Sequence, residues 1–284
     1  MKETILFILL LFVIEIGFAQ DSTVEVNKKN RLLNSDSTTK NTDMITNRPG
    51  ATESSKAVYK DGFQIEMGLE YGRVANEPGS KDLKEYLFIP NIGVQYGVSN
   101  NVELRIFTTN YAIRSKINSG PTQFVYELAN VIVGAKINLT NANGLLPEMA
   151  FLIDQGISTR PVYERSQWPT RGLLAWSYSL PSNFSLSGNF GYINEKEYFD
   201  QYITIGHSLS YSLNFGYGIK DNLGIFAEIY GQEQWNTGNG FPMILDGGMW
   251  YRITNKLQVD VSSGVNVNQH HYYVNAGISW LFLK

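Results

Sequence analysis

The sequence contains no cysteine and only 3 histidines in 284 residues. Without cysteine the chain has no disulfide framework, no thiol chemistry and no diacylglyceryl-cysteine lipid anchor. Its formal net charge of -3 is spread along the chain and offers no basic face for nucleic acid. After residue 19 no apolar run approaches the ~20 residues that a transmembrane helix needs. The sequence therefore predicts no nucleic-acid partner, no cofactor and no membrane-spanning helix.

The first nineteen residues have the pattern of an export signal. Lys2 precedes an unbroken apolar run over residues 5–14, and the small residues Gly17 and Ala19 follow it. The run is too short to span a bilayer, so we interpret residues 1–19 as a signal peptide that is removed on export. Residues 20–61 are polar and show no sustained period. They predict a flexible periplasmic N-terminal segment.

From Gly62 onward, apolar and polar residues alternate, which is the period of a β-strand with two different faces. In the stretch 201–217 this alternation runs unusually far for a soluble domain. Pro90 interrupts the second stretch, where the strand either begins after the proline or bulges at it. Twelve segments of this kind extend over 63–72, 85–97, 101–112, 125–139, 147–157, 170–180, 183–193, 201–217, 223–232, 242–253, 256–266 and 271–283.

Short and long connections alternate between these segments. Tight turns follow the second, sixth, eighth and tenth segments, and the others are mostly longer and rich in Gly, Pro, Asn and charge. Residues 140–146 are long for a turn and residues 268–270 are short for a loop. The alternation is typical of a transmembrane barrel with short periplasmic turns, longer outer loops and an even number of strands.

The polar face argues against the alternative of a periplasmic β-sandwich. It consists mainly of Gly, Ser, Asn and Thr with isolated charges, whereas a sandwich would show solvent a charged face. Aromatic residues also cluster where apolar strands meet short turns, as an interfacial girdle would: Tyr96, Tyr178, Phe184, Phe215, Tyr217, Tyr251 and Trp280. We therefore predict an all-β fold, an antiparallel up-and-down barrel of about twelve strands over residues 62–284. Its expected location is the outer membrane of a Gram-negative-type bacterium, with outer-membrane lipid and the barrel assembly machinery as partners.

Charged side chains on the polar face are predicted to line the lumen, because charge at lipid depth is costly. They form either a selectivity lining or ion pairs that brace and partly fill the barrel. The seven acids and three bases predict a modest cation preference if the pore is open. Arg48, beside Pro49, is a candidate plug residue that would enter the lumen and meet an acid there. The ten predicted lining residues are Glu66, Glu70, Glu103, Arg105, Lys136, Asp154, Glu228, Asp246, Arg252 and Asp260.

Catalysis and metal binding find little support in the sequence. A barrel phospholipase needs a His and a Ser on the same lipid-facing side, but His207 falls on the apolar face and the adjacent Ser208 on the polar face. His270 and His271 form a loop pair without a third ligand nearby in sequence. We predict neither an enzyme nor a metal site.

Several motifs together resemble one family of outer-membrane proteins. They are Ile45-Thr46-Asn47-Arg48-Pro49 with Thr52-Glu53, Gly62-Phe63-Gln64-Ile65-Glu66, the turn from Tyr96 to Arg105, Val133-Gly134-Ala135-Lys136, Glu228 with Tyr230-Gly231, and Asp246-Gly247-Gly248 before Tyr251. The chain is similar in these to transporters grouped with the phenol-degradation meta-pathway proteins. Asn47 departs from the more usual Asp, and Lys284 follows the terminal aromatic residue.

The resemblance implies a barrel assigned to transport, without a defined solute. We expect a channel or transporter for small solutes, hydrophobic or aromatic compounds among them. The alternative is a structural or receptor-type barrel with a filled lumen that acts through its outer loops.

Overall fold

A computed structural model describes residues 44–75, 83–116, 121–128, 131–157, 170–199, 202–234, 243–267 and 270–283. The predicted signal peptide and residues 20–43 of the predicted flexible segment lie outside these ranges, as do parts of the predicted loops. Among the described residues, none belongs to a helix long and apolar enough to cross a membrane.

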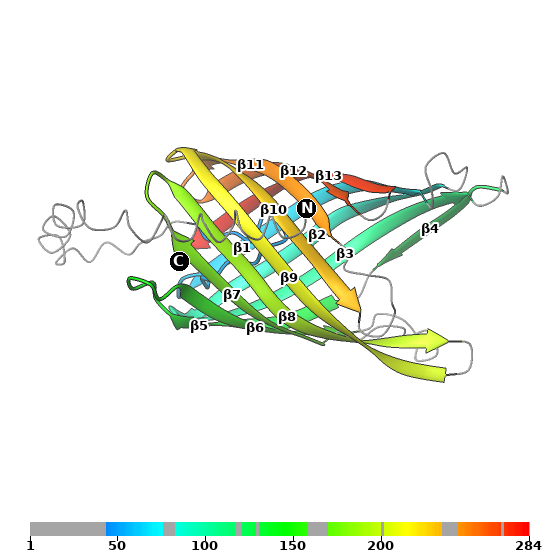
Figure 1. Ribbon diagram of the computed structural model, residues 1–284, viewed down its shortest axis with the longest axis horizontal. Coiled ribbons are helices and arrows are strands. Elements are labelled where there is room, and N and C mark those ends of the chain that lie inside the picture. Colours follow the sequence, from blue (N-terminus) through cyan, green and yellow to red (C-terminus); the bar gives the residue numbers. More distant parts are fainter. Residues whose placement is uncertain are drawn as a thin grey trace, which may run out of the picture. The chain divides into compact units, whose positions relative to one another are not determined.

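The described residues form one antiparallel sheet of thirteen labelled strands (Figure 1). The strands are β1 (Gly62–Ala75), β2 (Leu83–Ser99), β3 (Val102–Lys116), β4 (Gln123–Leu128), β5 (Val131–Thr140), β6 (Glu148–Ile157), β7 (Thr170–Ser179), β8 (Phe184–Phe199), β9 (Tyr202–Lys220), β10 (Leu223–Gln234), β11 (Ile244–Thr254), β12 (Leu257–Asn266) and β13 (His270–Leu283).

The sheet closes on itself because β1 pairs with β13 along its whole length, from Gly62 opposite Leu283 to Ala75 opposite His270. The labelled strands occupy twelve positions around the barrel, since β4 and β5 pair with different halves of β3. The prediction of a twelve-stranded antiparallel barrel is therefore confirmed. Closure leaves no edge strand along this ladder, so the backbone donors and acceptors find partners within the protein, as hydrocarbon requires.

The strand boundaries follow the predicted segments, with two informative differences. The predicted strand 125–139 is divided into β4 and β5 on either side of residues 129–130. The second predicted strand continues through Pro90, and the register of β2 with β3 shifts between Phe88 and Asn91. A proline cannot donate a ladder hydrogen bond, so the bulge accommodates it within the strand.

The two faces of the barrel are the reverse of those of a soluble domain. Along β1 the apolar side chains of Phe63, Met67 and Leu69 are exposed, whereas Gln64 and Glu66 are buried. The same inversion recurs along β12, where Val261 is exposed and its polar neighbours are buried. An apolar outside and a polar inside suit a barrel whose outer surface meets lipid.

Aromatic side chains gather on the outer surface near one end of the barrel. Phe184 lies 4.7 Å from Tyr217 between ring centroids, and Trp280 lies 4.5 Å from Phe282. We call this end the turn end, because the short connections 100–101, 141–147, 180–183, 221–222 and 255–256 lie there. The opposite end, which carries the longer connections, is the loop end. The rings occupy the depth expected for an interfacial girdle.

Candidate functional site

The ten charged side chains predicted to line the lumen lie on the inward face of the sheet. Glu70, Asp246 and Arg252 are half-buried. The other seven are buried: Glu66, Glu103, Arg105, Lys136, Asp154, Glu228 and Asp260. Such burial of charge requires partners, because an unpaired ion in a low-dielectric interior is costly. Many of those partners come from the chain just before the barrel.

Residues 44–60, which we call the inner segment, form a loop that enters the barrel and returns. At its start the Met44 N–H donates to the carbonyl of Asn255, 3.3 Å away in a turn-end connection. Met44 also packs against Val58 and Leu281 in a small apolar cluster. At its end Lys60 forms a bridge with Gly97. Both ends of the inner segment therefore lie at the turn end, and its middle reaches into the lumen.

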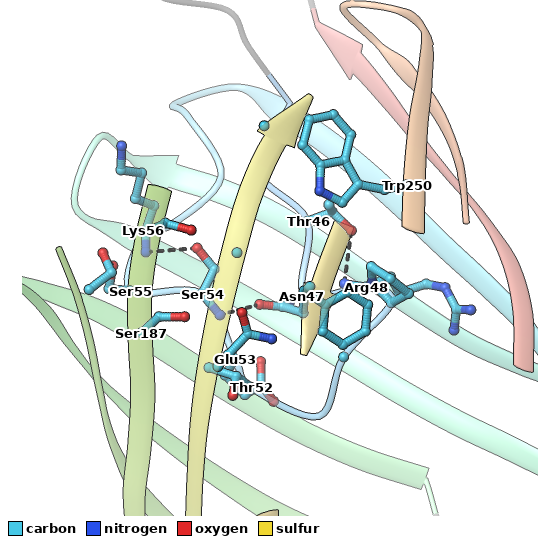
Figure 2. A pocket seen from close by; sticks show the side chains of 18 of the residues that line it. Thr46, Asn47, Arg48, Thr52, Glu53, Ser54, Ser55, Lys56, Ser187 and Trp250 are labelled. Atoms are coloured by element: carbon cyan, nitrogen blue, oxygen red, sulfur yellow. Dashed lines mark hydrogen bonds between the residues drawn. The ribbon is translucent and has the colours of Figure 1, made fainter. Parts of the chain in front are cut away.

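Hydrogen bonds within the inner segment hold its two limbs together (Figure 2). The Ser54 N–H donates to Asn47 Oδ1 at 3.0 Å, which joins the incoming limb to the returning one. The Arg48 N–H donates to Thr46 Oγ1 at 3.0 Å, and the Lys56 N–H to Ser54 Oγ at 3.1 Å. These bonds satisfy backbone donors that have no ladder partner, so the loop can persist without regular secondary structure.

Arg48 binds the wall formed by β12 and β13. Its Nη2 lies 2.9 Å from Asp260 Oδ1 and 2.6 Å from Asn275 Oδ1. The guanidinium fits because Gly68 and Gly277 lack side chains, and a Cβ atom at either position would collide with it. The predicted plug residue thus contacts a predicted lumen acid.

Glu228 of β10 receives the tip of the inner segment. Its carboxylate accepts the N–H groups of Ala51 and Thr52, each at 2.7 Å, and also the Thr52 hydroxyl. Hydrogen bonds to an ionised acceptor are roughly twice as strong as neutral ones. One buried side chain therefore fixes the turn of the loop.

Glu53 binds the opposite wall through two arginines. Arg105 Nη1 and Nη2 donate to the two Glu53 oxygens at 2.9 and 3.0 Å, and Arg171 Nη2 donates to Oε1 at 2.7 Å. Burial by itself raises the pKa of the Glu53 carboxyl, but the charges of Arg105 and Arg171 outweigh burial and hold the pKa well below its usual range. Asn189 accepts the Glu53 N–H at 2.6 Å.

The returning limb makes further bonds with β3 and β5. The Val58 N–H donates to Glu103 Oε2 at 2.9 Å. Lys136 Nζ donates to Asn47 Oδ1 and to the Lys56 carbonyl, both at 3.1 Å. On β1, Glu66 accepts the Asn47 N–H at 3.1 Å. Together with the bonds to Glu228 of β10, these contacts bond the inner segment to both sides of the barrel.

A cavity lies on each side of the inner segment. The one toward the turn end has a volume of about 380 Å³, and Ser187 and Trp250 are among its lining residues (Figure 2). The other has a volume of about 260 Å³ and is lined by Tyr230 and Tyr273, among others. Residues 47–50 and 53 line both cavities. The inner segment is therefore a partition between them.

The charges of the wall are unevenly distributed around the barrel. The arc from β3 to β7 carries three bases and three acids: Arg105, Lys136, Arg171, Glu103, Glu148 and Asp154. The arc from β10 through β13 to β1 carries mainly acids: Glu228, Asp246, Asp260, Glu66 and Glu70, with Arg252 near the turn end. The inner segment presents Glu53 to the first arc and Arg48 to the second. Its charges are complementary to those of the wall it faces.

Sequence reasoning missed three residues of this network, namely Glu53, Arg171 and Asn189. The strand parity could have found Arg171, which shares the inward face of β7 with Ser177 and Ser179. That signal is weak because Leu173 and Ala175 also face inward, so the apolar pattern of β7 is mixed. For Glu53, which lies outside any strand, no periodic signal exists.

The residues considered for chemistry are separated by the barrel wall. His207 is exposed on the outer surface, where Tyr192 is its hydrogen-bond partner, and Ser208 is buried on the inner side. His271 accepts or donates a hydrogen bond at 2.7 Å to the hydroxyl of Tyr86. Within the described ranges, no three His, Cys, Asp or Glu side chains are grouped so as to hold a metal ion.

The sequence matches the family described as "Putative MetA-pathway of phenol degradation" over residues 46–282. Among solved structures, it is similar to an outer-membrane channel from Pseudomonas putida F1, with a TM-score of 0.61, 11% identity and coverage of 84% of this chain and 100% of that one. It is also similar to the translocator domain of the autotransporter NalP from Neisseria meningitidis, with a TM-score of 0.51, 11% identity and coverage of 77% and 88%. At such identities the likeness concerns the fold. No curated protein gives a significant match.

Proposed function

This chain belongs to the family described as "Putative MetA-pathway of phenol degradation", and on that premise we propose that it is an outer-membrane channel for small solutes, closed by its own inner segment. The observation that carries the proposal is the partition. Two cavities of about 380 and 260 Å³ lie on either side of residues 44–60 within one closed barrel. If the inner segment withdraws, the two cavities become one path.

The bonds of the inner segment support reversible closure better than permanent filling. Its contacts with the wall are mostly hydrogen bonds and ion pairs, and its one apolar cluster is small and lies at the turn end. Water can replace polar contacts at modest net cost, whereas a packed apolar core would resist separation. The polar inner wall would be compatible with a hydrated lumen once the inner segment left it.

The runner-up is a structural or receptor-type barrel that acts through its outer loops. The observation that favours it is the buried ion network of Arg105, Asp154 and Glu53, which braces the barrel from within. Such a network would serve a filled barrel equally well. The two functions differ in whether the inner segment moves.

A disulfide lock tests that difference in a chain that has no cysteine of its own. Ser55 Oγ and Ser177 Oγ lie 2.7 Å apart, one on the inner segment and one on β7, so Ser55→Cys with Ser177→Cys brings two thiols within reach of a disulfide. In planar bilayers we expect openings of the double variant under reducing conditions. Oxidation should abolish them. The single variant Ser55→Cys is the matched control, and its conductance should be the same under oxidising and reducing conditions.

Each outcome decides between the candidates. Equal conductance in the oxidised and reduced double variant would show that the path does not require movement of the inner segment, and the proposed closure would be wrong. Absence of conductance in both the native chain and the reduced double variant would favour the filled barrel.

For the solute we propose small aromatic compounds, from the family description and from the rings of Phe107, Tyr230 and Tyr273 around the cavity toward the loop end. Phenol should then interrupt the current of the reduced channel at concentrations at which cyclohexanol, of similar size but without an aromatic ring, has no effect. Equal interruption by both would remove the aromatic preference.

A further inference from the structure

Resting on the proposed channel function, we propose that Arg105 and Arg171 form a binding site for the carboxylate group of a small organic anion. Glu53 of the inner segment occupies this site as a ligand supplied by the chain itself. The carboxylate of a solute would compete with that of Glu53, so that the arrival of the solute favours release of the inner segment.

The geometry is that of a preorganised carboxylate site. Arg105 is fully buried and offers one edge of its guanidinium, Nε and Nη2, to Asp154 at 2.8 and 2.7 Å. Asp154 thereby fixes the plane of the guanidinium. The other edge, Nη1 and Nη2, faces the lumen and holds both Glu53 oxygens. Two parallel N–H···O bonds to one carboxylate are the specific recognition mode of arginine.

Charge balance shows why the vacated site would need an anion. With Glu53 present, two arginines face two carboxylates. Without it, Arg105 and Arg171 share only Asp154, which leaves one positive charge and unpaired guanidinium donors facing the lumen. A charge-assisted bond to a carboxylate is stronger than one to water. An incoming carboxylate would restore the balance.

Glu53 covers the arginines and lines both cavities, whereas neither arginine lines either of these two cavities itself. A solute in either cavity therefore meets Glu53 first and reaches the arginines when Glu53 moves aside. Phe107 lines the cavity toward the loop end, and the Arg105 guanidinium lies 4.9 Å from the centre of its ring. An aromatic carboxylate could therefore place its charge on the arginines and its ring near Phe107.

The first test measures binding to the full chain in detergent. Glu53→Ala removes the CH₂ and carboxylate groups that acetate can replace, and acetamide is the neutral control of the same shape. We expect acetate, but not acetamide, to raise the midpoint of thermal unfolding of Glu53→Ala by at least about 2 °C, while the native chain responds less. Equal effects of acetate and acetamide, or no effect of either, would overturn the inference.

Variants of Arg171 test whether the acetate effect on the unfolding midpoint is specific to the arginine site. Arg171→Gln added to Glu53→Ala should abolish the acetate effect. Arg171→Lys keeps the charge but loses the guanidinium that bonds to both Glu53 and Asp154. It should reduce the effect, and it serves if the glutamine variant does not fold. Arg114→Gln is the matched control, because Arg114 pairs with Glu85 at an exposed position and should leave the effect intact. An acetate effect that is unchanged in the Arg171 variants would assign the binding elsewhere.

The second test asks whether a carboxylate competes with Glu53 in the native channel. In planar bilayers, benzoate should raise the open probability several-fold at concentrations at which benzamide does not. An open probability that does not change with benzoate would refute competition while leaving the channel function intact. A native chain that stays silent, combined with a positive acetate response of Glu53→Ala, would refute the channel and keep the anion site.

Discussion

At the scale of single residues, the inner segment is held by ion pairs with the wall and by the room that wall glycines leave for its side chains. Arg48 reaches Asp260 only because two glycines leave room for its guanidinium, and Glu53 reaches Arg105 only because Asp154 orients the partner from behind. Each contact joins one residue of the segment to one wall of the barrel. Small changes at the wall should therefore act on the segment without altering the strands.

Gly277→Ala tests the contact of Arg48. The added Cβ would collide with the guanidinium, which must then move away from Asp260 and Asn275. Losing charge-assisted hydrogen bonds of this kind costs ~1.5–3 kcal/mol each, so we expect more frequent openings in bilayers and a lower unfolding midpoint. Gly172→Ala is the matched control, because its Cβ would make only an ordinary contact with Phe151, 3.6 Å away. Identical behaviour of the two variants would contradict the anchoring role of Arg48.

At the scale of elements, the alternation of each strand decides which side chains meet lipid and which face the lumen. In β9 the odd-numbered side chains Leu213, Phe215 and Tyr217 are exposed outside, while Ser208 is buried and Ser212 bonds to the inner segment. Parity is a local property, since successive side chains of a strand point to opposite faces. The bulge at Pro90 inverts it, because Gln95 and Asn91 face inward on one side of the bulge and Phe88 and Tyr86 on the other.

Arginine scanning of β9 is the test at this scale. Leu213→Arg places a charge against lipid at a cost of ~2–4 kcal/mol near mid-depth and should reduce the assembled fraction in membranes. Ser210→Arg places the same side chain in the lumen and should assemble. The readout is the fraction of barrel that resists SDS at room temperature. Loss of assembly in Ser210→Arg with assembly of Leu213→Arg would mean that inside and outside have been exchanged.

At the scale of the whole molecule, closure of the sheet is the main source of stability. The ladder between β1 and β13 joins residues 195 to 221 positions apart in the chain. Opening the ring in hydrocarbon would expose the donors and acceptors of this ladder with no alternative partner.

Closure predicts a characteristic behaviour on gels. Purified protein in detergent should give a β-type circular dichroism spectrum and should migrate faster unheated than after boiling in SDS, because the closed barrel resists unfolding. Full solubility without detergent after removal of the signal peptide, or a helical spectrum, would be incompatible with the fold. Native protein that is unfolded in urea before loading is the control, because it marks the position of the slowly migrating unfolded form.

The sequence by itself determined the class of the fold, the number of strands around the barrel and the face of the ten charges predicted to line the lumen. These features follow from alternation and turn signals, which are local and survive without knowledge of the partners. The placement of Arg48 just before the barrel identified it as a residue that could meet a lumen acid. It did not identify which acid, because parity gives the face of a side chain and not its depth or its place around the ring.

Only the tertiary structure decided what the lumen charges do. Glu53 bonds to Arg105 and Arg171, 52 and 118 positions away in the chain, and these residues become neighbours only when the sheet has closed. The sum of seven acids and three bases, from which a cation preference was predicted, treats the wall as uniform. Bases and acids are mixed on the arc from β3 to β7, and acids predominate on the arc from β10 to β1, so an ion in the lumen meets a local arrangement and not a sum. Charge acts over a distance limited by screening, and three-dimensional proximity, which the sequence does not encode locally, sets which charges interact.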